Sequence, residues 1–128
     1  MSHYTTIEVK LNIYDISAIK DACKELGLTL RGRGKIRYFY THDQVTADYV
    51  ISIPNCPYDV GLVKDEKGNL KIVYDDFQGK VEQILGKNCS KLVQSAIFHK
   101  IKRAAQLKGK FISKRVMVKD SVFVEILI

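Results

Sequence analysis

The segment YDVGLVKDEKGNLKIVYDDF, residues 58–77, decides the fold class of this chain of 128 residues. Two runs of mostly β-branched, aliphatic and aromatic residues, 58–63 and 70–74, flank the polar stretch 65–69. Such side chains favour strands, whereas a charged stretch that contains glycine and asparagine favours a turn. The segment therefore predicts a β-hairpin with a loop of several residues.

Two more strands are predicted just before this hairpin. Residues 46–53 are rich in β-branched and aromatic side chains, and Pro54 and Pro57 end this strand because proline cannot donate a hydrogen bond to a sheet. Residues 36–40 alternate after the glycine-rich bend at 31–34. The hairpin is therefore expected to belong to a larger antiparallel sheet.

The N-terminal quarter predicts a strand followed by a helix. Apolar and polar residues alternate strictly over residues 6–13, as expected when one face of a strand is buried. Asp15 is then a candidate N-cap, apolar residues recur at helical spacing, and Gly27 supplies a left-handed stop. The predicted helix covers about residues 15–26.

The C-terminal third predicts helix and then strands. A helical stretch runs over 77–107, with a break near Gly86 and Asn88 and a main helix over 90–107. Residues 112–118 and 121–128 predict two strands joined by a tight turn at 119–120. Because the last run is almost entirely apolar, we expect its strand to be central or covered on both faces.

These elements predict a single α+β domain over residues 1–128. It is mainly an antiparallel sheet of about six to seven strands with two main helices packed on it, in the order β-α-β-β-β-β-α-β-β. Hydrophobic residues make up 46% and charged residues 27% of the chain, as in ordinary globular domains. No apolar run approaches the ~20 residues of a membrane span and no signal peptide is evident, so a cytoplasmic protein without a membrane partner is expected.

No motif for catalysis, metal or cofactor binding is present in the sequence. The three cysteines and three histidines are widely spaced, without a CxxC pair or two histidines four residues apart. Asp75 and Asp76 are adjacent on extended chain and point to opposite sides, so one of them is expected to cap the next helix. We therefore predict no catalytic residues, no metal and no cofactor, and an enzyme is not indicated.

The positive charge is concentrated at the C-terminal end. The net charge is +7, and the excess is +1 over residues 1–58, −2 over 59–84 and +8 over 85–128. A positive terminal third can attract a polyanion, whether nucleic acid or an acidic protein. The alternative is a solvated face that only keeps the protein in solution.

Two basic segments supply candidate binding residues. In RGRGKIRYFY, residues 31–40, guanidinium groups beside aromatic rings can pair with phosphates and stack on bases, although the segment does not match an RNA-recognition signature and also fits a simple glycine bend. In HKIKR, residues 99–103, the charge continues into 108–115. The candidate anion-binding or nucleic-acid-binding residues are Arg31, Arg33, Lys35, Arg37, Lys100, Lys102 and Arg103.

A family resemblance covers nearly the whole chain. The segments MSHYTTIEVKL, DISAIKDACKELGL, VTADYVISI, YDVGLVKDEKGNLKIVYDDF and KLVQSAIFHKIKRAAQLKG occur in that order. Together they resemble the family known as hypothetical chloroplast reading frame thirty-five, small proteins of plastids, cyanobacteria, other bacteria and phages. The family has no assigned function and no agreed active site. The lack of tryptophan and the basic end set this chain apart from plastid members.

Three alternative hypotheses about function follow from these observations. Genes of the family often lie near those of AAA-type ATPases, so the resemblance implies a non-catalytic accessory domain that binds a protein partner, such as an AAA-type ATPase. The alternative is a basic nucleic-acid-binding module. The third is an enzyme that acts on an anionic small molecule, which would need a pocket lined by convergent polar groups. Nothing in the sequence predicts an oligomeric state.

Overall fold

The computed structural model describes residues 4–37, 45–118 and 121–127, and the side chains of residues 11–37, 45–76 and 78–115. The helices are α1 (Ile16–Leu26), α2 (Lys80–Leu85) and α3 (Ser90–Leu107), with 3-10 turns η1 (Ile13–Asp15), η2 (Phe77–Gly79) and η3 (Lys87–Cys89). The strands are β1 (Tyr4–Asn12), β2 (Thr29–Arg31), β3 (Gly34–Lys35), β4 (Thr46–Ala47), β5 (Tyr49–Ser52), β6 (Asp59–Lys64), β7 (Asn69–Asp75), β8 (Phe111–Val118) and β9 (Ser121–Leu127).

The predicted α+β class with an antiparallel sheet and two main helices is confirmed. Five strands form one sheet in the order β1-β7-β6-β5-β2, and every neighbouring pair is antiparallel. The hairpin predicted over residues 58–77 is formed by β6 and β7, with Leu62 opposite Ile72. In its loop the Asp65 carboxylate accepts the backbone N–H groups of Lys67 and Asn69 at 2.8 and 2.9 Å. This side chain therefore holds the turn closed.

The helix α1 begins with a different cap from the one predicted. Asp15 precedes α1 but makes no capping hydrogen bond to it. Instead Asn12 caps η1: its side chain accepts the Tyr14 N–H at 3.1 Å, and its own N–H donates to Asp15 at 2.9 Å. The two residues thus form a reciprocal capping box one turn earlier. The end at Gly27 is as predicted, with a left-handed φ of 72°.

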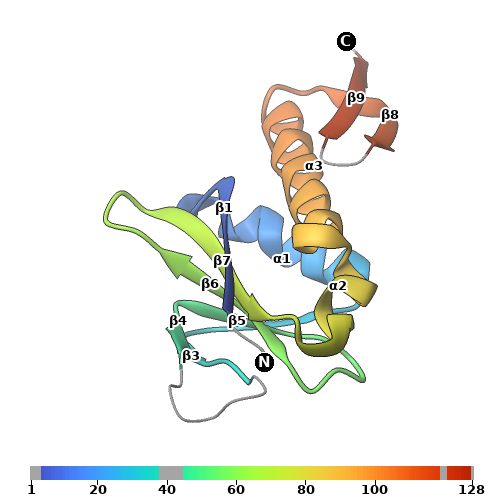
Figure 1. Cartoon of the computed structure of the whole chain (residues 1–128). Coiled ribbons are helices and arrows are strands. Elements are labelled where there is room, and N and C mark those ends of the chain that lie inside the picture. Colours follow the sequence, from blue (N-terminus) through green and yellow to red (C-terminus); the bar gives the residue numbers. More distant parts are fainter. Residues whose placement is uncertain (1–3, 38–44, 119–120, 128) are drawn as a thin grey trace.

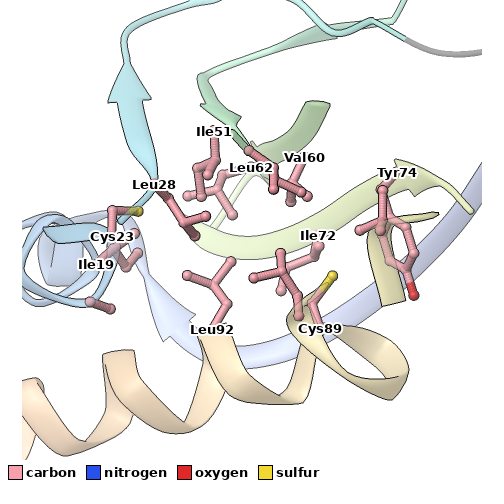
Figure 2. Close-up of a cluster of buried hydrophobic side chains, with 14 of the residues drawn as sticks. Ile19, Cys23, Leu28, Ile51, Val60, Leu62, Ile72, Tyr74, Cys89 and Leu92 are labelled. Carbon is pink, nitrogen blue, oxygen red and sulfur yellow. The ribbon is translucent and has the colours of Figure 1, made fainter. Parts of the chain in front are cut away.

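One face of the five-stranded sheet is covered by α1 and α3 (Figure 1). Strand side chains that alternate toward this face meet apolar side chains of both helices in the main core (Figure 2). Its fully buried members include Ile19, Ile51, Val60, Ile72, Tyr74 and Cys89. The Tyr74 hydroxyl donates to Glu82 at 2.9 Å, so the one polar atom of this ring keeps a partner.

A smaller core lies on the opposite face of the sheet. Ile36 and Ala47, which lie next to and on the paired strands β3 and β4, pack against Val50 and Val73. Gly61 lies at this contact, where an added Cβ would be only 3.0 Å from the Cβ of Ala47 and from Cγ2 of Ile36. We call the paired strands β3 and β4 the β3–β4 arm. Its close approach to the sheet therefore requires glycine at that position of β6.

The C-terminal strands differ from the prediction. Within the described part of the chain, β8 and β9 pair only with each other, and they lie at the C-terminal end of α3, away from the five-stranded sheet (Figure 1). The strand β9 is therefore not central. An apolar run indicates burial but does not say which element covers it, and here the neighbouring element is α3. The predicted residues 38–40, the turn at 119–120 and Ile128 lie outside the described residues.

The described cysteines are buried thiols. Burial raises the pKa of Cys23 to about 11 and that of Cys89 to about 12, so both stay protonated. Among the described residues, no three His, Cys, Asp or Glu side chains are grouped so that they could hold a metal ion. Over the same residues, no helix has the length and apolar character needed to cross a bilayer.

Replacing Gln94 with leucine is expected to raise the free energy of unfolding by about 1 kcal/mol. Gln94 is buried on α3, and its Nε2 has no hydrogen-bond partner among the described residues. Leucine removes this unmet donor at similar volume. Urea denaturation followed by far-UV circular dichroism measures the change, with Gln83→Leu on the exposed side of α2 as the control. A Gln94→Leu variant that is less stable than the wild type would show that the amide is needed.

Candidate nucleic-acid interface

The basic residues singled out in the sequence separate into two groups. Arg31, Arg33, Lys35 and Arg37 lie on or beside the short strands β2 and β3. The second group, Lys100, Lys102 and Arg103, lies on α3, which covers the sheet face opposite to the β3–β4 arm (Figure 1). The structure therefore does not bring the seven residues together on one surface.

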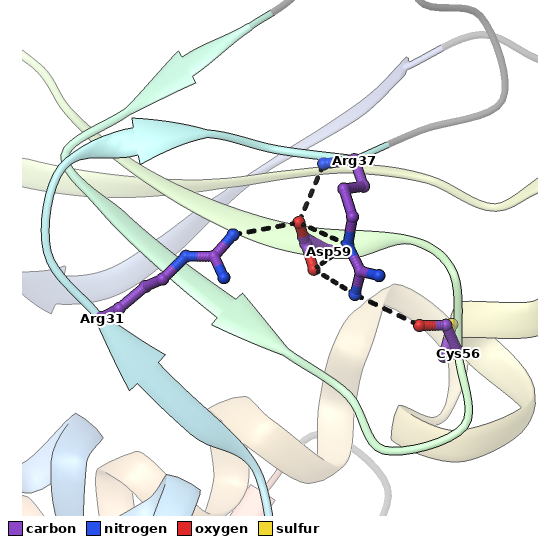
Figure 3. Close-up of polar contacts among 4 residues, drawn as sticks. All are labelled: Arg31, Arg37, Cys56 and Asp59. Atoms are coloured by element: carbon purple, nitrogen blue, oxygen red, sulfur yellow. Dashed lines mark hydrogen bonds and ion pairs between the residues drawn. The ribbon is translucent and has the colours of Figure 1, made fainter.

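The first group is organised by the buried carboxylate of Asp59 (Figure 3). Asp59 is 0 % exposed and accepts three hydrogen bonds from Arg37: its backbone N–H at 2.9 Å, Nε at 3.1 Å and Nη2 at 2.9 Å. Arg31 Nη2 lies 3.4 Å from the same carboxylate, and Arg37 Nη2 also donates to the carbonyl oxygen of Cys56. The hydrogen bonds to Asp59 raise the pKa of Arg37, and the contacts of both arginines hold residues 31–37 against β6.

Most of the other predicted residues also have a carboxylate partner. Arg33 lies 3.3 Å from Asp48, Lys100 lies 3.1 Å from Asp15, and Arg103 donates to Asp21 at 2.6 and 3.1 Å. Lys35 and Lys102 are exposed and form no ion pair with any described residue. Anion binding by the whole predicted set stays a prediction, but five of its seven cations already lie beside a carboxylate, and Arg31 and Arg37 share that of Asp59.

A second surface carries positive charge that is not compensated in this way. It comprises exposed or half-exposed residues at the end of α3 and the start of β8, and we call it the α3–β8 surface: Lys102, Leu107, Lys108, Lys110, Phe111 and Lys114. Its four lysines have no ion pair within the described ranges. Leu107 is 89 % exposed and Phe111 is 66 % exposed. Large exposed apolar side chains beside clustered lysines are typical of a binding surface.

The sequence prediction missed Leu107 and Phe111. A leucine at a helix end and a phenylalanine at the start of a strand both resemble core positions when no coordinates are known. The only signal in the sequence was their place on either side of Lys108, Gly109 and Lys110, where the helix ends. Of these four lysines, Lys102, Lys110 and Lys114 line a groove together with the exposed ring of Phe111.

The groove lies between α3 and β8 and has a volume of about 310 Å³. One wall is a stripe of α3, Phe98, Lys102 and Gln106, spaced four residues apart and rising ~12 Å along the helix. The other wall is residues 110–115. A second depression of about 390 Å³ begins on the other side of Lys102 and Gln106 and reaches α1. The exposed ridge of α3 is therefore flanked by concave surface on both sides.

Glu25 of α1 fixes the position of β8 beside α3. Arg115 of β8 donates to Glu25 through Nη1 at 2.5 Å and Nη2 at 3.0 Å, and its guanidinium lies 3.8 Å from the centroid of the Phe98 ring. Ser95 Oγ donates to the same carboxylate at 2.5 Å. The Arg115 contact, joined by that of Ser95, lowers the pKa of Glu25 to about 2. One carboxylate thus links α1, α3 and β8.

These polar groups do not form a nucleophile and base pair. Ser95 is fully buried and donates to Glu25 rather than to His99. His99 Nε2 lies 3.5 Å from Glu25 without a hydrogen bond to it. A serine nucleophile needs a base within hydrogen-bond reach of its own oxygen. The arrangement supports a structural role for Glu25 in shaping the groove.

Acidification is expected to weaken the contribution of Glu25 to stability. Its folded pKa of about 2 lies below the ordinary value of 4.5, so the stabilisation is present above pH 4.5 and is lost as the pH falls toward 2. Glu25 is 34 % exposed, so we allow for solvent screening and expect about 1–2 kcal/mol. Urea denaturation at pH 7 and near pH 2 measures it.

The matched variant is Glu25→Gln, which cannot titrate. It is expected to be less stable than the wild type at pH 7 and to approach it near pH 2. Glu66→Gln, in the exposed loop between β6 and β7, controls for the removal of one carboxylate. A constant difference between Glu25→Gln and wild type at both pH values would show that Glu25 acts without its charge.

Comparison of the chain with protein-family models, with curated proteins and with solved structures finds no match. The resemblance to the hypothetical chloroplast reading frame thirty-five family therefore stays a prediction.

Proposed function

We propose that this protein is a non-catalytic nucleic-acid-binding module of the cytoplasm that contacts phosphate groups through the α3–β8 surface. The observation that carries the proposal is the exposed ring of Phe111 beside lysines that form no ion pair with the described side chains. Lysine is a compact point charge suited to phosphate, and aromatic rings suit the faces of bases. The surface therefore offers a partner for two groups of a nucleic acid, the phosphate and the base.

Salt dependence follows from this chemistry. A lysine that contacts a phosphate displaces condensed counterions, and each such contact contributes about 0.7 to the slope of log affinity against log salt for a single strand. If all four lysines contact phosphates, the slope should be about −3 from this surface alone. Binding should therefore weaken steeply with added salt.

An acidic protein segment could also bind these lysines. The accessory function through a protein partner therefore stays a prediction. The exposed phenylalanine favours nucleic acid, because a flat ring can stack on any base. In the second depression Asp21 is paired with Arg103, and Glu25 is paired with Arg115 of β8. This pairing favours binding at the surface over chemistry in a pocket.

The test is fluorescence anisotropy with a labelled oligonucleotide of about 12 nucleotides, over about 50 to 200 mM salt. The variant Lys102→Glu, Lys108→Glu, Lys110→Glu, Lys114→Glu is expected to abolish binding. The control is Lys64→Glu, Lys67→Glu, Lys80→Glu, Lys87→Glu, at exposed lysines on β6, its loop and near α2. Each substitution lowers the net charge by two, so both variants fall from +7 to −1.

The outcomes separate the alternatives. Loss of binding in the first variant and retention in the control supports the proposal. Equal loss in both shows attraction by net charge alone, and no binding by the wild type overturns the proposal. If polyglutamate of matching length binds the wild type as tightly as the oligonucleotide does, the surface recognises an acidic protein instead.

A further inference from the structure

We infer that the ligand is a single strand and that one of its bases stacks on Phe111 at the α3–β8 groove; the inference rests on the proposed function. Phe111 begins β8, lines the groove and exposes 66 % of its surface. An aromatic ring that stays exposed to water forgoes about 25 cal/mol of hydrophobic stabilisation for each Å² of its apolar surface. Its position is therefore better explained by a ligand than by the fold.

The pairing of β8 with β9 places a cation on the same face as this ring. Phe111 lies opposite Leu127 and Lys114 lies opposite Glu125, because the register shifts between Ile112 and Lys114. Phe111 and Lys114 are therefore paired with alternate residues of β9, and both line the groove. Without the shift, Phe111 and Lys114 would lie on opposite faces of the hairpin. The bulge therefore places the Phe111 ring, which can stack on a base, beside the Lys114 ammonium group, which can bind the phosphate.

The groove offers one stacking platform among the described residues. The ring of its other aromatic residue, Phe98, is covered by the guanidinium of Arg115 at 3.8 Å, and that guanidinium is held by Glu25. Phe111 has no such cover. On the opposite wall Lys102 supplies a further cation, and Lys110 adjoins the ring. A base on Phe111 would thus have lysines on both sides for the flanking phosphates.

This geometry selects single strands over duplexes. In a duplex the bases are stacked inside the helix, and a ring on the protein surface can reach them only after they are unstacked. In a single strand the face of a base is available, and such stacking is tolerant of sequence. The expected ligand is therefore single-stranded DNA or RNA. It would be bound through the faces of its bases, without recognition of a particular sequence.

The test compares three labelled ligands of equal length: oligothymidylate, the same chain with abasic sites, and a duplex. The wild type should bind oligothymidylate about 5- to 150-fold more tightly than the abasic chain. Phe111→Ala should lose this preference while keeping its affinity for the abasic chain and its salt slope. Phe111→Tyr should retain the preference, and Tyr14→Ala, an exposed aromatic residue on η1, serves as the control.

The inference and the proposed function fail differently. Phe111→Ala with wild-type affinity for all three ligands overturns the inference, as does a wild type that binds the abasic chain or the duplex as tightly as oligothymidylate. In either case the lysines still bind phosphate. No binding to any of the three ligands overturns both. Because Phe111 is exposed, unchanged circular dichroism and urea midpoint are expected for its variants and verify their folding.

Discussion

Replacing Asp59 with alanine is expected to lower the free energy of unfolding by about 3 kcal/mol. The carboxylate is fully buried and accepts the backbone N–H and the guanidinium of Arg37, with Arg31 at its edge. Hydrogen bonds to a charged group contribute about 1.5–3 kcal/mol each and are not additive. The guanidinium groups are half-exposed and stay hydrated in the variant, so no buried charge is left behind.

Urea denaturation followed by far-UV circular dichroism measures this loss, since the chain has no tryptophan for fluorescence. Asp48→Ala is the matched control, because Asp48 also pairs with an arginine and a backbone N–H but lies nearer the surface. We expect it to cost less than about 1 kcal/mol. An Asp59 variant no less stable than the Asp48 variant would contradict the central role of Asp59.

Replacing Ile72 with alanine is expected to lower the free energy of unfolding by about 3–4 kcal/mol. Ile72 is 1 % exposed on the interior strand β7, under the helices α1 and α3 (Figure 2). The cost combines the lost transfer of the side chain from water with the cavity that remains. Denaturation in urea gives the value directly.

Ile84→Ala is the control for this substitution, since Ile84 on α2 is partly exposed and lies outside both buried clusters. It should cost less than about 1 kcal/mol. Similar losses at Ile72 and Ile84 would mean that the described core is not where the stability of the domain resides.

Local sequence patterns predicted most helices and strands, but they did not predict how all of these elements pack together. The hairpin of β6 and β7 and the helices α1 and α3 follow from periodicity and turn residues that lie within each segment. The separation of β8 and β9 from the main sheet does not. An apolar run predicts burial without naming its cover, and here α3 is the neighbour that only the folded chain supplies.

The candidate site was predicted in part for a similar reason. The basic residues of α3 and β8 are visible in the sequence, but which of them are neutralised depends on contacts between distant residues. Arg37 meets a carboxylate 22 residues away, Arg103 one 82 residues away and Arg115 one 90 residues away. The exposure of Phe111 likewise follows from where the hairpin lies against α3 and not from its neighbours in sequence.

The same long-range contacts shape the proposed surface before a ligand arrives. Glu25 anchors Arg115, and Arg115 covers Phe98, so β8 is held beside α3 and the groove stays open between them. A preformed groove lowers the cost of ordering on binding. We infer that loosening this anchor would weaken base stacking more than phosphate contact.

The most direct test of the α3–β8 surface is an NMR titration of ¹⁵N-labelled protein with oligothymidylate. The expected result is that the largest amide shift changes fall within residues 102–115, with small changes at residues 31–37. Changes centred on residues 31–37 or on the five-stranded sheet would contradict the account.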